Sequence, residues 1–335
     1  MKIAILGAGT WGTALAALLT KNGQDTTLWS AISEEIDILE KTGVHKNLPG
    51  ATLPKELKFE KDLARALNGA KLVLFVVPSA FMRSTARAAA KHVADGAVLI
   101  SAAKGIEPKT LKTMTEIIDD EMKACGKSNY SLVALSGPTH AEEVAIGQPT
   151  SIVSACEDEG TALLVAEAFS ASCMRVYTNT DVLGVELAGA LKNIIALASG
   201  INRGMGHGDN SQAMLMTRGA AEITRIGLAM GCKRRTFMGL AGIGDLIVTC
   251  TSHHSRNNRC GELIGKGMSY EDASREIGMV VEGYYALEAA MELSHKYNVE
   301  MPITEAVYDV IKNGQSVKDA MLALMNRNIK NELDT

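Results

Sequence analysis

The feature that most constrains this chain is a glycine-rich turn between an apolar strand and an apolar helix. The apolar run 1–6 is followed by Gly7-Ala8-Gly9-Thr10-Trp11-Gly12 and then by the apolar stretch 13–19. In this context the first glycine permits a tight turn, the second lets a pyrophosphate approach the backbone, and the third lets helix and strand pack closely. The N–H groups that begin the helix then face the pyrophosphate. The turn predicts a dinucleotide-binding βαβ unit, and the alternative is a glycine turn without a ligand.

An alternation of strands and helices continues through the first half of the chain. Further strands are expected at 24–29, 71–77, 97–102, 131–135, 150–154 and 174–177. Helices are expected at 33–41, with Ser33 as its cap, and at 61–67, 80–93, 111–125 and 160–170. In the strand expected at 71–77, every residue after Lys71 is apolar, which is typical of a strand buried on both faces of a parallel sheet. This pattern predicts an α/β fold with a doubly wound, Rossmann-like parallel sheet, whose ligands lie off the carboxyl ends of the strands.

After residue 180 only helical periods remain. They cover 181–199, 212–230, 258–265, 269–277, 284–297, 303–312 and 316–325. The change predicts a dinucleotide-binding Rossmann domain at 1–179 and an all-α substrate-binding and catalytic domain at 180–335. The most apolar stretch, 182–201, contains Glu186, Lys192 and Asn193, so we expect a buried helix rather than a membrane span.

Charge and cysteine usage exclude several classes of protein. The 34 basic and 38 acidic residues are well mixed and give a net charge of −4, which argues against a nucleic-acid partner or a membrane surface. A strand that starts at Met1 leaves no place for a signal peptide. The 6 cysteines form no Cys-x-x-Cys pair and are typical of reduced cytoplasmic thiols. Cys250, His253, His254 and Cys260 fit no common zinc spacing, so we expect no metal.

Lys192 is the most informative single residue, because the helix around it is otherwise nearly all apolar. Burying an ammonium group is costly unless an opposite charge pairs with it. Desolvation also lowers the pKa of a lysine toward the range useful for proton transfer. Lys192 is therefore a candidate acid/base, and the alternative is a lysine whose amine reaches water.

A second polar cluster runs from Asp245 through Thr249 to Ser255-Arg256-Asn257. The planar fork of Arg256 suits a phosphate, and the two residues beside it could supply hydroxyl and amide donors. Asp245, between small residues, could orient a lysine or a substrate hydroxyl. The alternative is that Ser255 is only a helix cap and Arg256 only a surface charge.

A third cluster is Val280-Val281-Glu282-Gly283. Glu282 could reach a nicotinamide amide or a ribose. The alternative is a glutamate that only complements the dipole in the first turn of a helix.

Several stretches match one enzyme family in sequence and in order. They are GAGTWGTALA (7–16), VVPS (76–79), AKGIE (103–107), LSGPTHAEEVA (135–145), GVELAGALKNIIAL (184–197), TRGAAEI (217–223), FMGLAGIGDLIVTCTS (237–252), SRNNR (255–259), VVEGY (280–284) and MPIT (301–304). LKN, GLAGIGDL and SRN are much more specific than a glycine turn. From end to end, the chain resembles the soluble bacterial-type NAD(P)-dependent sn-glycerol-3-phosphate dehydrogenases.

The resemblance implies a reaction, a cofactor and an assembly. The reaction is reversible hydride transfer between NAD(P)H and dihydroxyacetone phosphate, which gives sn-glycerol 3-phosphate for glycerophospholipid synthesis. The cofactor is NAD or NADP, and no metal is implied. The protein is implied to be a cytoplasmic homodimer.

The resemblance also assigns the site residues. The catalytic residues would be Lys192, Lys104 and Asp245. The substrate contacts would be Lys104, Gly137, Thr139, Lys192, Asn193, Asp245, Thr249, Ser255, Arg256 and Asn257. The glycine turn and the end of the second strand contribute Gly7, Gly9, Gly12 and Ala31 as cofactor contacts. The resemblance adds Thr10, Trp11, Lys104, Ala141, Arg256, Val280 and Glu282.

Two parts of the chain depart from the family pattern: the end of the second strand and the stretch 200–210. Relatives commonly carry Arg or His two residues after the tryptophan that ends the second strand, where this chain has Ala31. In the stretch 200–210 the chain has Arg203 and His207, where relatives more often have an acid and an apolar or aromatic residue. The sequence assigns no role to the side chains of Arg203 and His207.

The first departure bears on the choice between NAD and NADP. An acid at this strand end would hold the ribose 2′-OH, and an arginine would attract a 2′-phosphate. Neither stands there, and we expect Glu34 and Glu35 to point into solvent from the following helix. Both cofactors should therefore be accepted, and Lys46 and Arg83 are the first residues to test if NADPH is preferred.

Two competing functions remain open at this point. A β-hydroxyacid or sugar-acid dehydrogenase of the same architecture would bind a carboxylate and leave Ser255-Arg256-Asn257 unexplained. A non-catalytic nicotinamide-binding redox sensor would leave Lys104, Lys192 and Asp245 without a role. Cofactor oxidation with dihydroxyacetone phosphate and with a panel of ketoacids separates the three.

Overall fold

The computed structural model describes residues 1–329 and 331–332. The chain folds as two compact units. Unit 1 comprises Met1–Lys104 and Lys112–Val182, and unit 2 comprises Gly105–Leu111 and Leu183–Thr335. Each unit has its own core, as expected for a chain of 335 residues.

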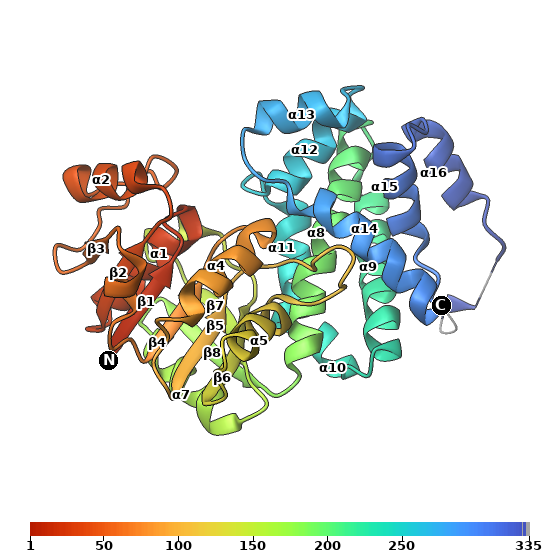
Figure 1. Ribbon diagram of the computed structural model, residues 1–335. Helices are drawn as coiled ribbons and strands as arrows, with labels where there is room; N and C mark the ends of the chain where they lie inside the picture. Colours follow the sequence, from red (N-terminus) through yellow and green to blue (C-terminus); the bar gives the residue numbers. More distant parts are fainter. Residues whose placement is uncertain (330, 333–335) are drawn as a thin grey trace. The chain divides into compact units, whose positions relative to one another are not determined.

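Unit 1 is built on an eight-stranded sheet in the order β3-β2-β1-β4-β5-β6-β7-β8 (Figure 1). The strands are β1 Lys2–Leu6, β2 Asp25–Trp29, β3 Lys58–Glu60, β4 Leu72–Phe75, β5 Ala97–Ser101, β6 Tyr130–Ser136, β7 Thr150–Ala155 and β8 Met174–Asn179. Side chains of β1 alternate between two cores. Ile3 and Ile5 face one core, whereas Ala4 and Leu6 face the other, so the sheet is covered on both faces. The predicted Rossmann-like α/β fold is confirmed.

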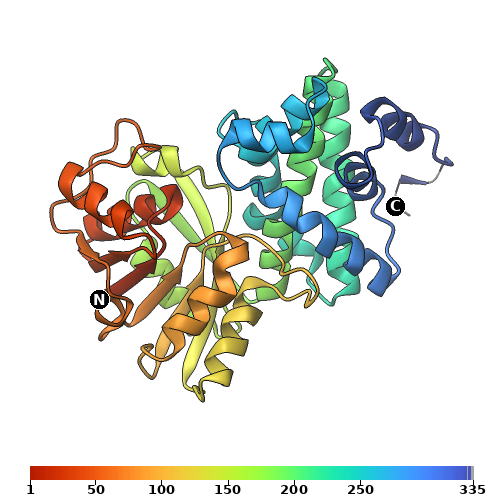
Figure 2. The same ribbon diagram turned by 45° about the horizontal axis from the view of Figure 1, so that its top comes forward.

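The helices of unit 1 divide between the two faces of the sheet (Figure 2). They are α1 Thr10–Lys21, α2 Ser33–Thr42, α3 Leu63–Leu67, the short η1 Ser79–Phe81, α4 Met82–Ala90, α5 Met114–Ala124, α6 Ala141–Ala145 and α7 Glu159–Phe169. Helices α1 and α7 contribute side chains to the core that contains Ile3, and α4 and α5 to the core that contains Leu6. The doubly wound arrangement follows from this division.

The sheet is not wholly parallel, because β7 pairs antiparallel with β6. A parallel return needs a crossover long enough to run back along the sheet, usually a full helix. The connection from β6 to β7 contains only the five-residue helix α6, which spans about 7.5 Å at 1.5 Å per residue. The chain therefore turns back beside β6, and the prediction of an all-parallel sheet is wrong at this one pair.

Two local predictions are also corrected in unit 1. Ser33 is the first residue of α2 rather than its cap, and the residue at the N-cap is Ile32. The Ile32 N–H instead donates a hydrogen bond to the Ser30 hydroxyl at 3.1 Å. The three-residue strand β3 was not predicted, since Lys58-Phe59-Glu60 is too short to carry a strand pattern.

Unit 2 is helical. Its elements are α8 Val182–Gly204, α9 Asp209–Ala229, α10 Arg234–Phe237, the π-helical turn η2 Leu240–Gly244, α11 Asp245–Thr251, α12 Arg256–Gly265, α13 Tyr270–Ile277, α14 Glu282–Tyr297, α15 Pro302–Lys312 and α16 Val317–Met325. The elements α10, η2 and α11 were not predicted, because four to seven residues show little helical period.

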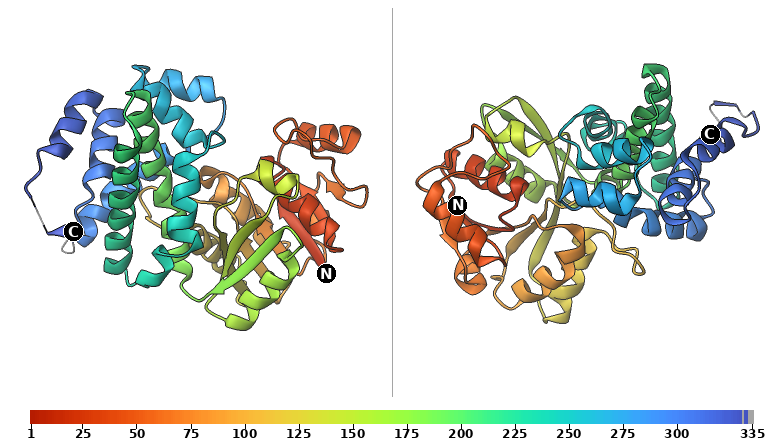
Figure 3. Two further views of the ribbon diagram at one scale, coloured as in Figure 1. Left: turned by 180° about the vertical axis from the view of Figure 1, so that it is seen from behind. Right: turned by 90° about the horizontal axis from the view of Figure 1, so that it is seen from above.

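Helix α8 forms the centre of unit 2, and α9 runs alongside it (Figure 3). Every residue from Gly184 to Asn202 is buried. Within the described residues, α8 is the one helix whose length and composition would allow it to cross a membrane, but 89% of its most apolar window is buried inside the structure. That burial is typical of a core helix.

Candidate active site

The glycine turn of unit 1 is as tight as its sequence predicts. Gly7 has φ +125°, and a Cβ there would lie 2.5 Å from the Val76 carbonyl oxygen. A Cβ on Gly12 would lie 1.9 Å from the Gly7 carbonyl oxygen. Side chains are excluded at both positions, because the start of α1 packs directly on the turn.

Gly9 differs from these two glycines, because the space around it is open. It is the N-cap of the 12-residue helix α1 and brings no side chain to the first N–H groups of the helix. A Cβ on Gly9 would meet nothing within 4 Å. Open space in front of unsatisfied N–H groups suits an anion, and the positive end of the helix dipole favours it. Thr10 and Trp11, both half-buried, flank this position.

Other predicted residues of unit 1 lie where the sheet strands end. The Lys104 Nζ donates to the Gly137 carbonyl at 3.1 Å, and the Thr139 hydroxyl donates to the same oxygen at 3.0 Å. Ala141 is the first residue of α6. The Ser136 hydroxyl at the end of β6 is buried and has no hydrogen-bond partner among the described residues. Polar groups therefore gather at the ends of β5 and β6, as expected for an α/β sheet.

At the end of β2 the structure differs from the prediction. Ala31 is exposed, as is Glu34. Glu35, however, does not simply point into solvent: its Oε2 accepts a hydrogen bond from the Ser30 hydroxyl at 2.6 Å. Ser30 thereby links the strand end to the first turn of α2.

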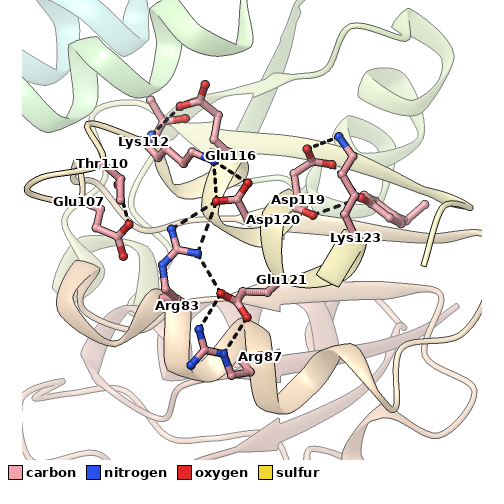
Figure 4. A network of polar contacts seen from close by, with 12 residues as sticks. Arg83, Arg87, Glu107, Thr110, Lys112, Glu116, Asp119, Asp120, Glu121 and Lys123 are labelled. Carbon is pink, nitrogen blue, oxygen red and sulfur yellow. Dashed lines mark hydrogen bonds and ion pairs between the residues drawn. The ribbon is translucent and has the colours of Figure 1, made fainter. Parts of the chain in front are cut away.

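Arg83 lies in an ion-pair network between α4 and α5 (Figure 4). Its guanidinium donates to Glu121 at 2.8 Å and reaches Asp120 at 3.4 Å. Arg87 also bonds Glu121 at 2.8 Å, and Lys112 bonds Asp120 at 2.6 Å. Hydrogen bonds from Arg87 and Arg83 hold the pKa of Glu121 below its ordinary value despite burial. The network joins two helices and engages the arginine that the sequence offered for a 2′-phosphate.

In unit 2, Lys192 is buried and paired. Its ammonium lies 2.5 Å from the Asp245 Oδ1 and 2.6 Å from the Thr249 hydroxyl. Lys192 is 5% exposed and Asp245 1% exposed. The alternative of a lysine that reaches water is wrong. The cost of desolvating both charges is offset by their attraction and by the added hydrogen bond.

Asp245 reaches Lys192 because of the turn that precedes it. The π-helical segment η2 ends directly before Asp245, which begins α11. The segment packs so tightly that a Cβ on Gly242 would lie 2.0 Å from the Phe237 carbonyl oxygen. Thr249 is four residues further along α11, and its hydroxyl also bonds the Asp245 carbonyl at 2.6 Å. One short helix therefore supplies two partners of Lys192.

Asn257 joins the three predicted clusters of unit 2. Its Nδ2 donates to the Asn193 Oδ1 at 3.0 Å, and its Oδ1 accepts the Gly283 N–H at 2.9 Å. Ser255 is the N-cap of α12, and its hydroxyl accepts the Asn258 N–H at 3.2 Å. Arg256, the first residue of α12, is exposed. The start of α12 is thus tied to the residue after Lys192 and to the start of α14.

Helices α8 and α12 approach closely through glycines. A Cβ on Gly200 would lie 2.0 Å from the Asn258 carbonyl oxygen, and a Cβ on Gly261 2.2 Å from the Leu197 carbonyl oxygen. One turn on, a Cβ on Gly204 would lie 2.2 Å from the Glu262 carbonyl oxygen. Any side chain there would separate the helices and pull Asn257 away from Asn193.

The remaining predicted residues lie at the start of α14. Glu282 is its first residue and half-buried, in the position that complements the helix dipole. Val280 is half-buried just before it. The zinc reading of the segment around Cys250 finds no support, since no group of three or more His, Cys, Asp or Glu side chains within residues 1–329 and 331–332 could hold a metal ion.

Sequence reasoning left Arg203 without a role, and the structure supplies a contact. Its Nη1 donates to the Asn258 Oδ1 at 2.9 Å, and the Asn258 Nδ2 donates to the Cys250 carbonyl at 2.8 Å. Arg203 therefore braces the segment between α11 and α12, next to Ser255. A charged residue near the end of an apolar helix was the signal in the sequence. His207, in the loop after α8, bonds Asn202 near the end of that helix at 3.0 Å.

Comparison with known proteins places both units in one family. Residues 2–162 match the N-terminal model of the NAD-dependent glycerol-3-phosphate dehydrogenases, and residues 181–322 match the C-terminal model. A curated Lactobacillus delbrueckii glycerol-3-phosphate dehydrogenase [NAD(P)+] 2 is 56% identical over 99% of each chain. A Bacillus cereus glycerol-3-phosphate dehydrogenase [NAD(P)+] is 50% identical over 99% of this chain and 98% of its own.

Solved structures agree with this placement. A Coxiella burnetii glycerol-3-phosphate dehydrogenase superposes with a TM-score of 0.92 at 35% identity, covering 97% of this chain and 99% of its own. A ketopantoate reductase from Ralstonia eutropha has a TM-score of 0.61 at 19% identity, so it shares the fold alone. A hydroxyacid or sugar-acid dehydrogenase is therefore not favoured. The chain belongs to the NAD-dependent glycerol-3-phosphate dehydrogenase family.

Proposed function

We propose that this chain reduces dihydroxyacetone phosphate to sn-glycerol 3-phosphate, reversibly, with NAD(P)H. The observation that carries the proposal is the buried Lys192–Asp245 pair, a proton donor held in a low-dielectric site by a carboxylate. Membership of the glycerol-3-phosphate dehydrogenase family supports the identity of the substrate.

Lys192 is proposed as the catalytic acid. As the substrate carbonyl is reduced at C2, negative charge grows on its oxygen. The Lys192 ammonium stabilises that charge and then gives up a proton to form the alcohol. Asp245 and Thr249 hold the amine in place throughout. In the reverse direction the neutral amine takes the proton back.

The start of α12 is proposed to bind the phosphate. Arg256 can offer two parallel N–H donors, and the first N–H groups of α12 add to the positive potential there. Ser255 and Asn257 lie on either side of Arg256. Asn257 bonds Asn193, the neighbour of Lys192, so phosphate binding fixes the substrate relative to the acid.

Unit 1 is proposed to hold the dinucleotide, with its pyrophosphate on Gly7, Gly9 and Gly12. When bound, NAD(P)H supplies the hydride. Further cofactor contacts are proposed at Thr10, Trp11, Ala31, Lys104, Ala141, Arg256, Val280 and Glu282. Lys104, Gly137 and Thr139 are also proposed as substrate contacts, with Lys104 as a second cation that stabilises oxygen charge.

The proposal extends to the organisation of the protein. Residues 1–179 are assigned to cofactor binding, and residues 180–335 to substrate binding and catalysis. We propose a cytoplasmic homodimer whose product feeds glycerophospholipid synthesis. Sedimentation of the purified chain tests the dimer.

The test is cofactor oxidation, followed by the absorbance of NADH. Dihydroxyacetone phosphate should be reduced far faster than unphosphorylated dihydroxyacetone or any ketoacid of a small panel. Comparable rates with and without the phosphate would contradict the assignment. Turnover of a ketoacid alone would favour a hydroxyacid dehydrogenase, and tight cofactor binding with no turnover would favour a redox sensor.

A variant separates catalysis from binding. Lys192→Ala should abolish turnover, because proton transfer and charge stabilisation are both lost. Binding of NADH, measured by calorimetry, should persist because the glycine turn is unchanged. Near-normal turnover of this variant would remove Lys192 from the mechanism.

A further inference from the structure

The end of β2 lies directly beside the glycine turn. The Gly7 N–H donates to the Trp29 carbonyl at 2.8 Å, and Leu6 is in register with Trp29 across the two strands. Ser30 follows Trp29 and so begins next to the turn. In a dinucleotide-binding βαβ unit, this strand end is where the adenosine ribose is recognised.

A carboxylate is held at this strand end. The Ser30 hydroxyl donates to the Glu35 Oε2 at 2.6 Å and accepts the Ile32 N–H at 3.1 Å. Both bonds orient Ser30, and the first draws the Glu35 side chain back from α2 toward the strand. Glu34, one residue earlier in the same helical turn, is exposed and makes no such contact with Ser30.

Three basic side chains bear on whether this carboxylate is offset: His45, Arg83 and Lys46. Burial lowers the pKa of His45 below its ordinary value even though Glu35 acts to raise it, which favours the neutral ring. Arg83 bonds Glu121 and Asp120. The sequence analysis named Lys46 and Arg83 as possible contacts of a 2′-phosphate. Of these two, Lys46 is exposed.

We propose that Glu35, oriented by Ser30, reads the ribose 2′-hydroxyl and makes this chain selective for NAD(H) over NADP(H). The carboxylate accepts a hydrogen bond from the 2′-hydroxyl, whereas a 2′-phosphate would bring a like charge of about −1.5 to −2 against it. Selection then comes from a residue six positions beyond the strand end at Trp29, not from the uncharged Ser30 or Ala31. This inference rests on the proposed cofactor site in unit 1.

The experiment is calorimetric binding of NADH and of NADPH to the full chain without substrate. The wild type should bind NADH at least about tenfold more tightly than NADPH, since close like charges cost several kcal/mol. Glu35→Gln keeps the size of the side chain and an acceptor for Ser30. It should reduce this ratio by roughly tenfold, mainly because NADPH binds more tightly.

Two further variants sharpen the test. Glu34→Gln removes the same charge from the same helical turn and should leave the ratio unchanged. Ser30→Ala should reduce the ratio part of the way, because Glu35 keeps its charge but loses its orientation. An unchanged ratio in Ser30→Ala would overturn the positioning role, and an equal effect of the two glutamine variants would reduce the role of Glu35 to general charge.

Other outcomes overturn the proposal as a whole. One is equal affinity of the wild type for the two cofactors. Another is a preference for NADPH that Lys46→Gln removes, which would make Lys46 the reader of the 2′-phosphate. Cofactor binding is measured without substrate. A failure to reduce dihydroxyacetone phosphate would therefore contradict the proposed function without affecting the measured preference for NADH. Thermal unfolding, followed by tryptophan fluorescence to which Trp29 contributes, identifies any variant that has not folded.

Discussion

Removing one partner of the buried Lys192–Asp245 pair should be far more damaging than removing both. Lys192 is 5% exposed and Asp245 1% exposed, and their charged atoms lie 2.5 Å apart. In Asp245→Leu the ammonium stays buried without its counter-charge, which costs about 3–5 kcal/mol. Lys192→Met leaves the carboxylate in the same position and should cost a similar amount. In the double variant neither charge of the pair remains, and most of the loss should be recovered.

The measurement is thermal unfolding followed by far-UV circular dichroism, which is dominated by the helices of unit 2. At about 2–4 °C per kcal/mol, each single variant should lower the transition by roughly 6–20 °C. Trp11 and Trp29, the 2 tryptophans of the chain, both lie in unit 1, so their fluorescence follows that unit separately. The double variant should melt close to the wild type while lacking activity.

Two results would refute the reasoning. If either single variant melts within about 2 °C of the wild type, the charge left behind is solvated and the site is not a low-dielectric one. If the double variant is as unstable as the singles, the loss comes from packing around Lys192 and Asp245 rather than from an unpaired charge. Both alternatives would weaken the assignment of Lys192 as a desolvated acid.

Three other predictions follow from separate features. Arg256→Ala should cost about 2–5 kcal/mol in kcat/KM for dihydroxyacetone phosphate, as for the loss of a charged hydrogen-bonded partner, and little for the unphosphorylated ketone; equal losses for both substrates would exclude phosphate binding. Burial raises the pKa of Glu222 to about 7 from 4.5, so the folded state binds a proton more tightly than the unfolded state, and this stability is fully present below pH 4.5 and lost as pH rises to 7. The free energy of unfolding from urea titrations should fall by up to about 3 kcal/mol across that window relative to Glu222→Gln, and parallel pH profiles of the two proteins would contradict this. Gly200→Ala places a methyl group 2.0 Å from the Asn258 carbonyl oxygen and should cost at least about 1–3 kcal/mol of stability and raise KM for the substrate. The control Gly208→Ala meets nothing within 4 Å but replaces the N-cap of α9, so it should cost no more than about 1 kcal/mol and leave KM unchanged. A normal KM in Gly200→Ala would show that the site does not need the close approach of α8 and α12.

Local features of the sequence anticipated most of the first unit. The glycine turn at Gly7 and Gly12 could be interpreted directly, because its constraints act between residues close in the chain. The strands were found because buried parallel strands are unbroken apolar runs. One exception is the three-residue strand β3, which is too short to carry a pattern. Another is the pair β6 and β7, whose direction depends on how far the intervening chain can travel, and no residue type in either strand records that.

The candidate site of unit 2 was only partly predictable. Lys192 was conspicuous because a charge in an apolar helix needs a partner, but its partners are 53 and 57 residues away. No periodicity points from α8 to α11. The resemblance to a known family brought these residues into one site, whereas the physical pairing became visible only in the fold.

By itself, the sequence determined the fold class, the dinucleotide turn and the family, because these depend on local backbone constraints and on short, specific motifs. The tertiary structure alone decided which groups meet. It paired Lys192 with Asp245 through a π-helical turn and tied Asn257 to two other helices. The physical reason is that hydrogen bonds and ion pairs act over about 3 Å, and contacts at that range between residues far apart in sequence exist only once the helices and strands have packed.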